Sequence, residues 1–217
     1  MRTSTKQSPR RGRPPSYDRA VALRAIRDVF WERGFSAASL DDIAAAAGMN
    51  RPSLYGAFGD KREMYVAALR MFSVELGREM QKALEAPTLR GALDAFYVAA
   101  IQEYLSGKAG PRGCLVICTA VTEATGDATI RSVLAAILAE LDSLVTLRIV
   151  RAQAEGDCSA DGDAKVLARL ATSVLHSIAV RARAGARRGE LLTIAHATVD
   201  LIAGPASAPA PARRAAR

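Results

Sequence analysis

The stretch SLDDIAAAAGMNRPSLYGAFGDKRE, residues 39–63, carries the local signals that decide the fold. Ser39 and Asp42 form an S-x-x-D capping pattern, which predicts a helix over residues 40–47. Gly48 is expected to end that helix, because glycine adopts the left-handed backbone conformation without a steric penalty. A short turn then leads to a second helix.

The second helix is expected over residues 51–58. Asn50 is a favourable N-cap residue, and Pro52 is tolerated in a first turn because an N–H there has no partner within the helix. Gly59 ends this helix, and Asp60 begins a longer one. A helix, a turn with glycine and a short helix form the helix-turn-helix pattern, whose second helix enters the major groove of DNA.

These residues resemble the DNA-binding domain of the tetracycline-repressor (TetR-like) family of bacterial transcriptional regulators. The matching features are Gly34-Phe35, the run S-x-x-D-I-A-x-x-A-G at residues 39–48 and the run S-L-Y-x-x-F-x-D-K at residues 53–61. The resemblance implies an all-α fold, with an N-terminal three-helix helix-turn-helix domain and a six-helix C-terminal ligand-binding and dimerisation domain. It also implies a homodimeric regulator, most often a repressor, that a small-molecule effector releases from a palindromic operator in double-stranded DNA.

The resemblance assigns Tyr55 and Lys61 to positions that contact phosphates. Arg51 and Ser53 are the candidates for base contact, since arginine can bind guanine in a bidentate manner. Gly56 stands where many family members carry a larger side chain, as does Ala57, so the family's base contacts are not carried over to these positions. The expected DNA-binding residues are Arg11, Arg13, Ser39, Arg51, Pro52, Ser53, Tyr55 and Lys61.

The formal net charge of +8 is concentrated at the two ends of the chain. Residues 1–17 carry five basic side chains and no acid, and residues 204–217 carry three arginines, so the sequence between them is formally neutral. Both ends are expected to be disordered. Within the first, Arg11-Gly12-Arg13-Pro14 has the form of an AT-hook core, which favours the minor groove of DNA. The C-terminal arginines are better explained as an aid to solubility.

Helical periodicity predicts nine helices and two domains, a DNA-binding domain over residues 18–63 and a regulatory domain over residues 64–203. The segment 113–123 has the β-branched composition of a strand, but no partner strand exists, so a buried helix is expected. In the first helix, Trp31 lies off the apolar stripe and is expected at the edge of the core. That stripe consists of Val21, Ala25, Ile26, Val29 and Phe30.

A dimer interface is expected on residues 163–203, because the resemblance places the last two helices of each subunit there. A two-fold dimer presents two reading helices to half-sites related by the same symmetry. The alternative is that the apolar residues of this segment only fill the core of one subunit. The candidates for the interface are Val166, Leu170, Val174, Leu191, Ile194 and Ile202.

Several other classes of protein are disfavoured. No apolar run approaches the roughly 18 residues of a membrane span, and the basic N-terminus lacks a secretory signal. Three cysteines form no disulfide framework, which favours a reducing cytoplasm. His176 and His196 are the two histidines, and no catalytic or cofactor motif accompanies them, so neither an enzyme nor a cofactor is expected. An architectural protein that binds DNA through its tails alone would lack sequence preference.

Cys114 is the residue with two open interpretations. It follows a G-P-R-G loop at the expected start of a helix, where the helix dipole and Arg112 would favour the reactive thiolate. The G-C-L sequence there looks like the same element in family members that respond to thiol-reactive electrophiles. Alternatively, Cys114 is a small buried hydrophobe in an apolar pocket. The expected effector-binding residues are Phe96, Tyr97, Tyr104, Cys114, Cys118 and His176.

Overall fold

The computed structural model describes residues 17–107, 110–158 and 162–204. Within these ranges the chain is helical and has no strand, which confirms the all-α prediction. The expected disordered ends, including Arg11 and Arg13, fall almost wholly outside the described residues. The elements are α1 (Arg19–Ala37), α2 (Leu40–Ala47), α3 (Arg51–Phe58), α4 (Lys61–Ala83), α5 (Leu89–Tyr104), the π-helix η1 (Val116–Ala120), α6 (Val121–Glu123), α7 (Ala128–Glu155), α8 (Ala164–Arg183) and α9 (Arg188–Ala203).

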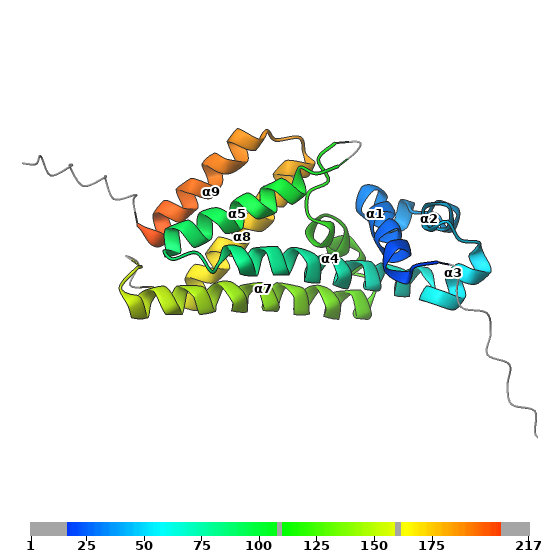
Figure 1. Cartoon of the computed structure of the whole chain (residues 1–217), viewed down its shortest axis with the longest axis horizontal. Coiled ribbons are helices and arrows are strands. Elements are labelled where there is room, and N and C mark those ends of the chain that lie inside the picture. The colour runs from blue at the N-terminus through cyan, green and yellow to red at the C-terminus, as the bar shows by residue number, and fades with distance from the viewer. Residues whose placement is uncertain (1–16, 108–109, 159–161, 205–217) are drawn as a thin grey trace, which may run out of the picture.

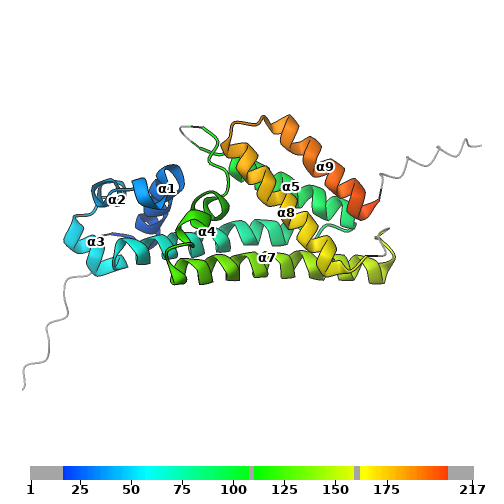
Figure 2. The ribbon, with the colours of Figure 1, turned by 180° about the vertical axis from the view of Figure 1, so that it is seen from behind.

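The described part of the molecule is elongated, with α1, α2 and α3 gathered at one end (Figure 1). The long helix α4 begins beneath them and runs into the other helices. There it lies beside α7, and α5, α8 and α9 form a second layer above this pair, as the view from behind also shows (Figure 2). The short η1 packs against α1, α4, α7 and α8, so it lies at the junction between the three N-terminal helices and the rest of the molecule.

The capping signals of residues 39–63 are confirmed. The Ser39 side chain accepts a hydrogen bond from the Asp42 backbone N–H, and the Asp42 carboxylate accepts one from the Ser39 backbone N–H. Gly48 adopts the left-handed conformation with φ of 63°. Asn50 caps α3 by accepting a hydrogen bond from the Ser53 backbone N–H at 2.8 Å. Local chemistry therefore sets the bounds of α2 and α3 as predicted.

The first helix differs from the prediction in its buried face. Gly34, with φ of 75° and ψ of 176°, interrupts the helical backbone, and a further short helical stretch continues to Ala37. Val21 is 55% exposed rather than buried. Trp31 is fully buried rather than at the edge of the core, because the Phe72 ring of α4 meets its ring at 4.6 Å. The buried stripe of α1 consists of Ala22, Ile26, Phe30 and Trp31.

A set of four residues, which we call the joint, connects α1 to the second layer: Trp31, Arg112, Gly113 and Arg183. The Trp31 indole N–H donates a hydrogen bond to the Gly113 carbonyl oxygen at 3.0 Å, and the Arg112 guanidinium lies 3.8 Å from the centre of the indole ring. From α8, Arg183 donates to the carbonyl oxygens of Trp31 and Arg112, both at 3.1 Å. The joint therefore fixes α1, the loop before η1 and the end of α8 to one another.

Candidate nucleic-acid interface and ligand cavity

The helix α3 has one face buried in the core and one face in solvent. Leu54 and Phe58 point inward and are buried. The core beneath them includes Ile26 and Ile43, which anchor α1 and α2 under the same helix. The outward face carries four of the expected DNA-binding residues, namely Arg51, Pro52, Ser53 and Tyr55, all of which are exposed. The predicted reading surface is therefore accessible at the end of the molecule.

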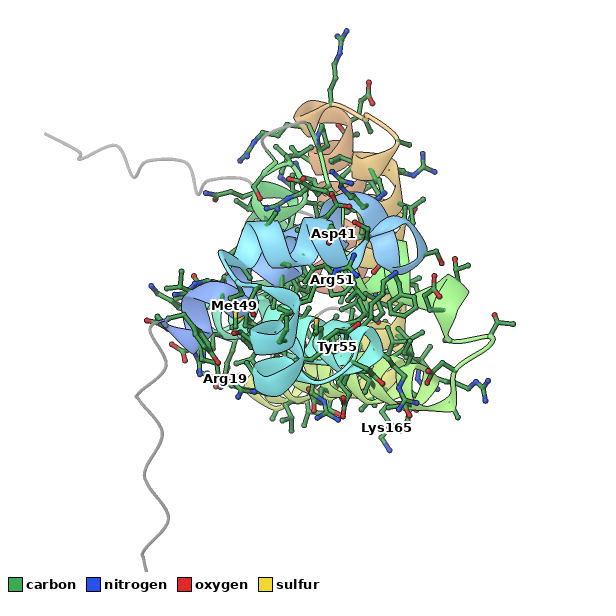
Figure 3. All side chains as sticks on the ribbon, turned by 90° about the vertical axis from the view of Figure 1, so that its right-hand side faces the viewer. Arg19, Asp41, Met49, Arg51, Tyr55 and Lys165 are labelled. Atoms are coloured by element: carbon green, nitrogen blue, oxygen red, sulfur yellow. The ribbon has the colours of Figure 1, made fainter. Side chains whose placement is uncertain are left out.

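Asp41 of α2 holds the guanidinium of Arg51 in a bidentate ion pair. The Arg51 Nε atom lies 2.8 Å from Asp41 Oδ1, and Nη2 lies 2.6 Å from Oδ2. Figure 3 shows the two side chains next to each other on the outer surface, with Tyr55 further along α3. The hydrogen bond from Arg51 lowers the pKa of Asp41, so this carboxylate stays ionised at neutral pH. The two charges of this pair neutralise each other on the surface that is proposed to face DNA.

Sequence reasoning did not predict the ion pair between Asp41 and Arg51. Asp41 and Arg51 lie ten positions apart on two different helices, and no capping or helical spacing relates them. They meet because the Gly48 turn sets the angle between α2 and α3. One feature of the sequence pointed to this pair. Asp41 is an acidic residue in the first turn of α2, and the capping of that helix uses only Ser39 and Asp42.

Two other expected DNA-binding residues already have partners within the protein. The Ser39 hydroxyl donates to the Asp42 carboxylate at 2.7 Å. The Lys61 ammonium lies 4.7 Å from the centre of the Phe35 ring and 3.5 Å from the Ser36 carbonyl oxygen. These contacts hold both side chains at the end of the molecule that carries α3. Arg19, which was not among the expected DNA-binding residues, covers the Phe58 ring at 5.0 Å on the same end.

A cavity of about 300 Å³ lies beneath this end, bounded mainly by α4, α7 and η1. Tyr104, Cys114 and His176, three of the six expected effector-binding residues, line it. Burial lowers the pKa of His176, so its imidazole is neutral at pH 7. Most of the other lining residues are apolar, and Arg78, Gln81 and Glu140 add polar groups to the wall. The main apolar lining residues are Phe72, Leu76, Met80, Val116, Ile117, Ile137, Leu141 and Leu144.

The other three expected effector-binding residues lie outside this cavity. Phe96 and Tyr97 are fully buried against each other, and the Tyr97 hydroxyl donates to the Ala171 carbonyl oxygen at 2.9 Å. They belong to the packing between α5 and α8. The Cys118 sulfur lies 3.8 Å from the Ala179 carbonyl oxygen of α8, so it faces that helix.

Of the two interpretations of Cys114, the buried apolar residue fits this conformation and the activated thiol does not. Cys114 is buried, and burial raises the pKa of its thiol to about 12, which outweighs any effect of a helix end. Arg112 does not provide the expected positive charge, because its guanidinium covers Trp31 and its Nε donates to the Ser106 carbonyl oxygen at 2.9 Å. Cys114 is therefore a neutral thiol in the cavity wall.

Within the described ranges, no helix is both long and apolar enough to cross a membrane. The histidine, cysteine and acidic side chains of those ranges also form no group of three that could hold a metal ion. The arrangement is thus an exposed reading surface above a mostly apolar cavity, with the joint and α4 between them.

Comparison with known families matches residues 22–68 to "Bacterial regulatory proteins, tetR family" and residues 93–197 to "Tetracyclin repressor-like, C-terminal domain". Among curated proteins, the HTH-type transcriptional repressor ComR of Escherichia coli (strain K12) is 31% identical over 195 residues. That match covers 88% of this chain and 91% of ComR.

Two solved structures have closely similar folds. A cysteine mutant of the TetR family transcriptional regulator CifR, complexed with a 26-bp double-strand operator DNA, has a TM-score of 0.80 and 33% identity, covering 88% of this chain and 100% of that chain. The reduced form of E. coli NemR has a TM-score of 0.75 and 21% identity, covering 87% of this chain and 98% of that chain, and it supports the fold alone.

Proposed function

This chain belongs to the TetR family of bacterial transcriptional regulators, and we propose that it is a homodimeric repressor whose α3 reads operator DNA until an effector enters the cavity. In this proposal residues 18–63 bind DNA and residues 64–203 regulate that binding. The observation that carries it is the exposed polar face of α3, which stands at the end of the molecule with Arg51 held outward. CifR, which is 33% identical, forms a complex with operator DNA.

The effector proposal rests on the position of the cavity. Met80 and Leu76 belong to α4, the same helix whose first turn carries Lys61 under the reading surface. A molecule between α4 and α7 would change the angle at which α4 supports α1, α2 and α3. The lining is mainly apolar, His176 is neutral, and the two charged lining residues, Arg78 and Glu140, have opposite signs, so we propose a small, mainly apolar effector without a net charge.

The homodimer proposal rests on an exposed stripe of apolar and small residues on α8. Val166, Leu170, Ser173 and Val180 recur at helical spacing and are all exposed. On α9, Leu201 is 75% exposed. Two of the residues expected in the interface do not fit, because Leu191 and Ile202 are fully buried inside the subunit. A symmetric interface would cover the α8 stripe.

Leu170→Glu tests the dimer by placing a charge in the proposed interface. The expected result is a monomer at micromolar concentration by sedimentation, with loss of operator binding. Leu147→Glu is the matched control, since Leu147 is exposed on α7 outside the proposed interface. A wild-type monomer at that concentration would remove the dimer proposal.

Selection of bound fragments from random DNA tests whether the protein recognises a specific DNA sequence. The expected result is enrichment of an inverted repeat, because a two-fold dimer presents two copies of α3 to symmetric half-sites. A screen of apolar compounds for release of the selected DNA then tests the effector. Equal binding of all sequences would contradict a sequence-specific regulator, and would favour an architectural protein that uses only its basic ends.

A thiol-sensing repressor that acts through Cys114 is the second candidate. The observation that favours it is that Cys114 lines the cavity and directly follows Gly113, whose carbonyl oxygen is bonded to Trp31. Addition of the sulfur to an electron-poor alkene would form an S–C bond and move the thiol proton to carbon. The raised pKa predicts slow reaction at pH 7. If Cys114→Ser is released from DNA by a maleimide as wild type is, a non-covalent effector remains.

A further inference from the structure

We propose that Asp41 is a specificity-determining residue of this regulator, which positions Arg51 so that its free edge reads a guanine and not the phosphate backbone. The inference rests on the proposed function, in which α3 enters the major groove. It goes beyond that function by assigning the discrimination between operator and random DNA to a residue on α2.

The geometry of the ion pair leaves the reading edge of Arg51 free. A guanidinium has five N–H donors in a fixed plane, and Asp41 takes one on Nε and one on Nη2. The adjacent end of the guanidinium, formed by Nη1 and the remaining N–H of Nη2, still presents two parallel donors. Those two donors match the N7 and O6 acceptors that guanine shows in the major groove.

Asp41 is also a rigid support. It lies in the first turn of α2, where the reciprocal hydrogen bonds between Ser39 and Asp42 fix the backbone. A free arginine side chain samples many rotamers and loses this freedom on binding. When Asp41 fixes the plane of the Arg51 guanidinium before DNA arrives, less freedom is lost on reading the correct base.

The negative charge of Asp41 also lowers the affinity of this surface for random DNA. An unpaired arginine on this face would attract any phosphate, whereas the Arg51–Asp41 pair carries no net charge. A purely stabilising role does not explain the pair, because the two side chains are 53% and 76% exposed and exposed ion pairs contribute little to folding. The Arg33–Asp42 pair nearby is different, since Asp42 also accepts the capping hydrogen bond of α2.

The experiment measures the ratio of affinities for the selected operator and for random DNA in the full chain. Asp41→Ala is expected to bind random DNA more tightly and to lower this ratio about tenfold, the size of one good base contact. Glu32→Ala, which removes an exposed carboxylate from α1, is the matched control. It is expected to leave the ratio unchanged. Circular dichroism confirms that each variant is folded.

Two further measurements identify the contact. Replacing an operator guanine by 7-deazaguanine removes its N7 acceptor. At one position in each half-site, this replacement is expected to lower the affinity of wild type several-fold and the affinity of Asp41→Ala much less. Arg51→Lys keeps the positive charge without the planar edge, so it is expected to lower the ratio as Asp41→Ala does. The double variant should then lose less than the sum of the two single losses.

An unchanged ratio for Asp41→Ala would overturn the inference and leave a surface ion pair without a role in reading. A higher ratio would also overturn it, because Asp41 would then compete with the operator for Arg51. If wild type prefers no DNA sequence at all, both the proposed function and this inference fail. That outcome is distinct, because it is visible before any variant is measured.

Discussion

The reading head, which we define as residues 39–59, and the joint both depend on arginine, but they use it in opposite ways. In the reading head, Arg51 bonds a side-chain carboxylate, and both partners are largely exposed. In the joint, Arg183 bonds backbone carbonyl oxygens and Arg112 covers the ring of fully buried Trp31. One arrangement leaves donors available to a ligand, and the other uses them inside the protein.

This difference predicts how changes in each region affect folding stability and DNA binding. Exposed ion pairs contribute only about 0–1 kcal/mol to folding, so substitutions of the paired side chains in the reading head should change stability little. Removing one partner of a buried hydrogen bond costs about 1–3 kcal/mol, so the joint resists rearrangement. Changes in the joint should therefore act on stability first, and changes in the reading head on DNA binding alone.

The largest effect is expected for Gly113→Ala. Gly113 has φ of 66°, and an added methyl carbon would lie 2.6 Å from the Ala179 carbonyl oxygen and 2.8 Å from the Cys118 sulfur. We expect a loss of about 2–4 kcal/mol in the free energy of unfolding, measured by urea denaturation. Gly156→Ala is the control, with φ of 72° and open space around it, and it should lose only about 1–2 kcal/mol. Equal losses would show that the joint is not tightly packed.

Trp31→Phe is expected to have the next largest effect. It removes the indole N–H and leaves the Gly113 carbonyl oxygen without that donor, for a loss of about 1–3 kcal/mol. Operator affinity should also fall, because α1 loses its side-chain hydrogen bond to the loop before η1. Tyr97→Phe, the control, removes a buried hydrogen bond far from the joint and should lower stability without changing affinity. If Trp31→Phe and Tyr97→Phe bind the operator with equal affinity, the joint has no special role in DNA binding.

Removal of residues 1–14 tests whether the basic N-terminal end adds to the reading head. The deletion removes Arg10, Arg11 and Arg13. We expect weaker binding and a slope of log K against log salt that is shallower by up to about three units. Stability should not change. An identical salt slope would show that these arginines do not contact DNA.

The smallest effect is expected for Lys61→Ala. Its position over the Phe35 ring suits one phosphate contact beside the reading head. Affinity should fall by a similar factor on operator and random DNA, with a salt slope shallower by about one unit. Arg62→Ala is the neighbouring control, since it removes an equal charge from the same turn of α4. A loss confined to the operator would assign Lys61 to base reading.

The sequence allowed prediction of the features that local backbone chemistry determines. The caps at Ser39, Asn50 and Asp60, and the left-handed Gly48, depend only on residues within three or four positions, so α2 and α3 were predicted correctly. The outward position of Arg51 followed from the same caps. These features required no knowledge of tertiary contacts.

The features that sequence did not reveal depend on partners far away in the chain. Trp31 is buried by partners far along the chain, namely the Phe72 ring of α4 and the Gly113 carbonyl oxygen 82 positions later, which no helical period indicates. The sequence left the state of the Cys114 thiol open between two interpretations, because the cavity wall that buries it comes from several helices. Likewise, the pairing of Asp41 with Arg51 requires the angle between two helices, which the pattern of either helix does not contain.

The most direct test of the account measures two properties of Arg51→Ala: its operator-to-random affinity ratio and its free energy of unfolding. The account predicts a ratio at least about tenfold lower than that of wild type, since one bidentate guanine contact is lost. It also predicts a free energy of unfolding within about 0.5 kcal/mol of wild type, because the ion pair with Asp41 is exposed. An unchanged ratio, or a large loss of stability, would contradict a reading head whose arginine is held ready for DNA.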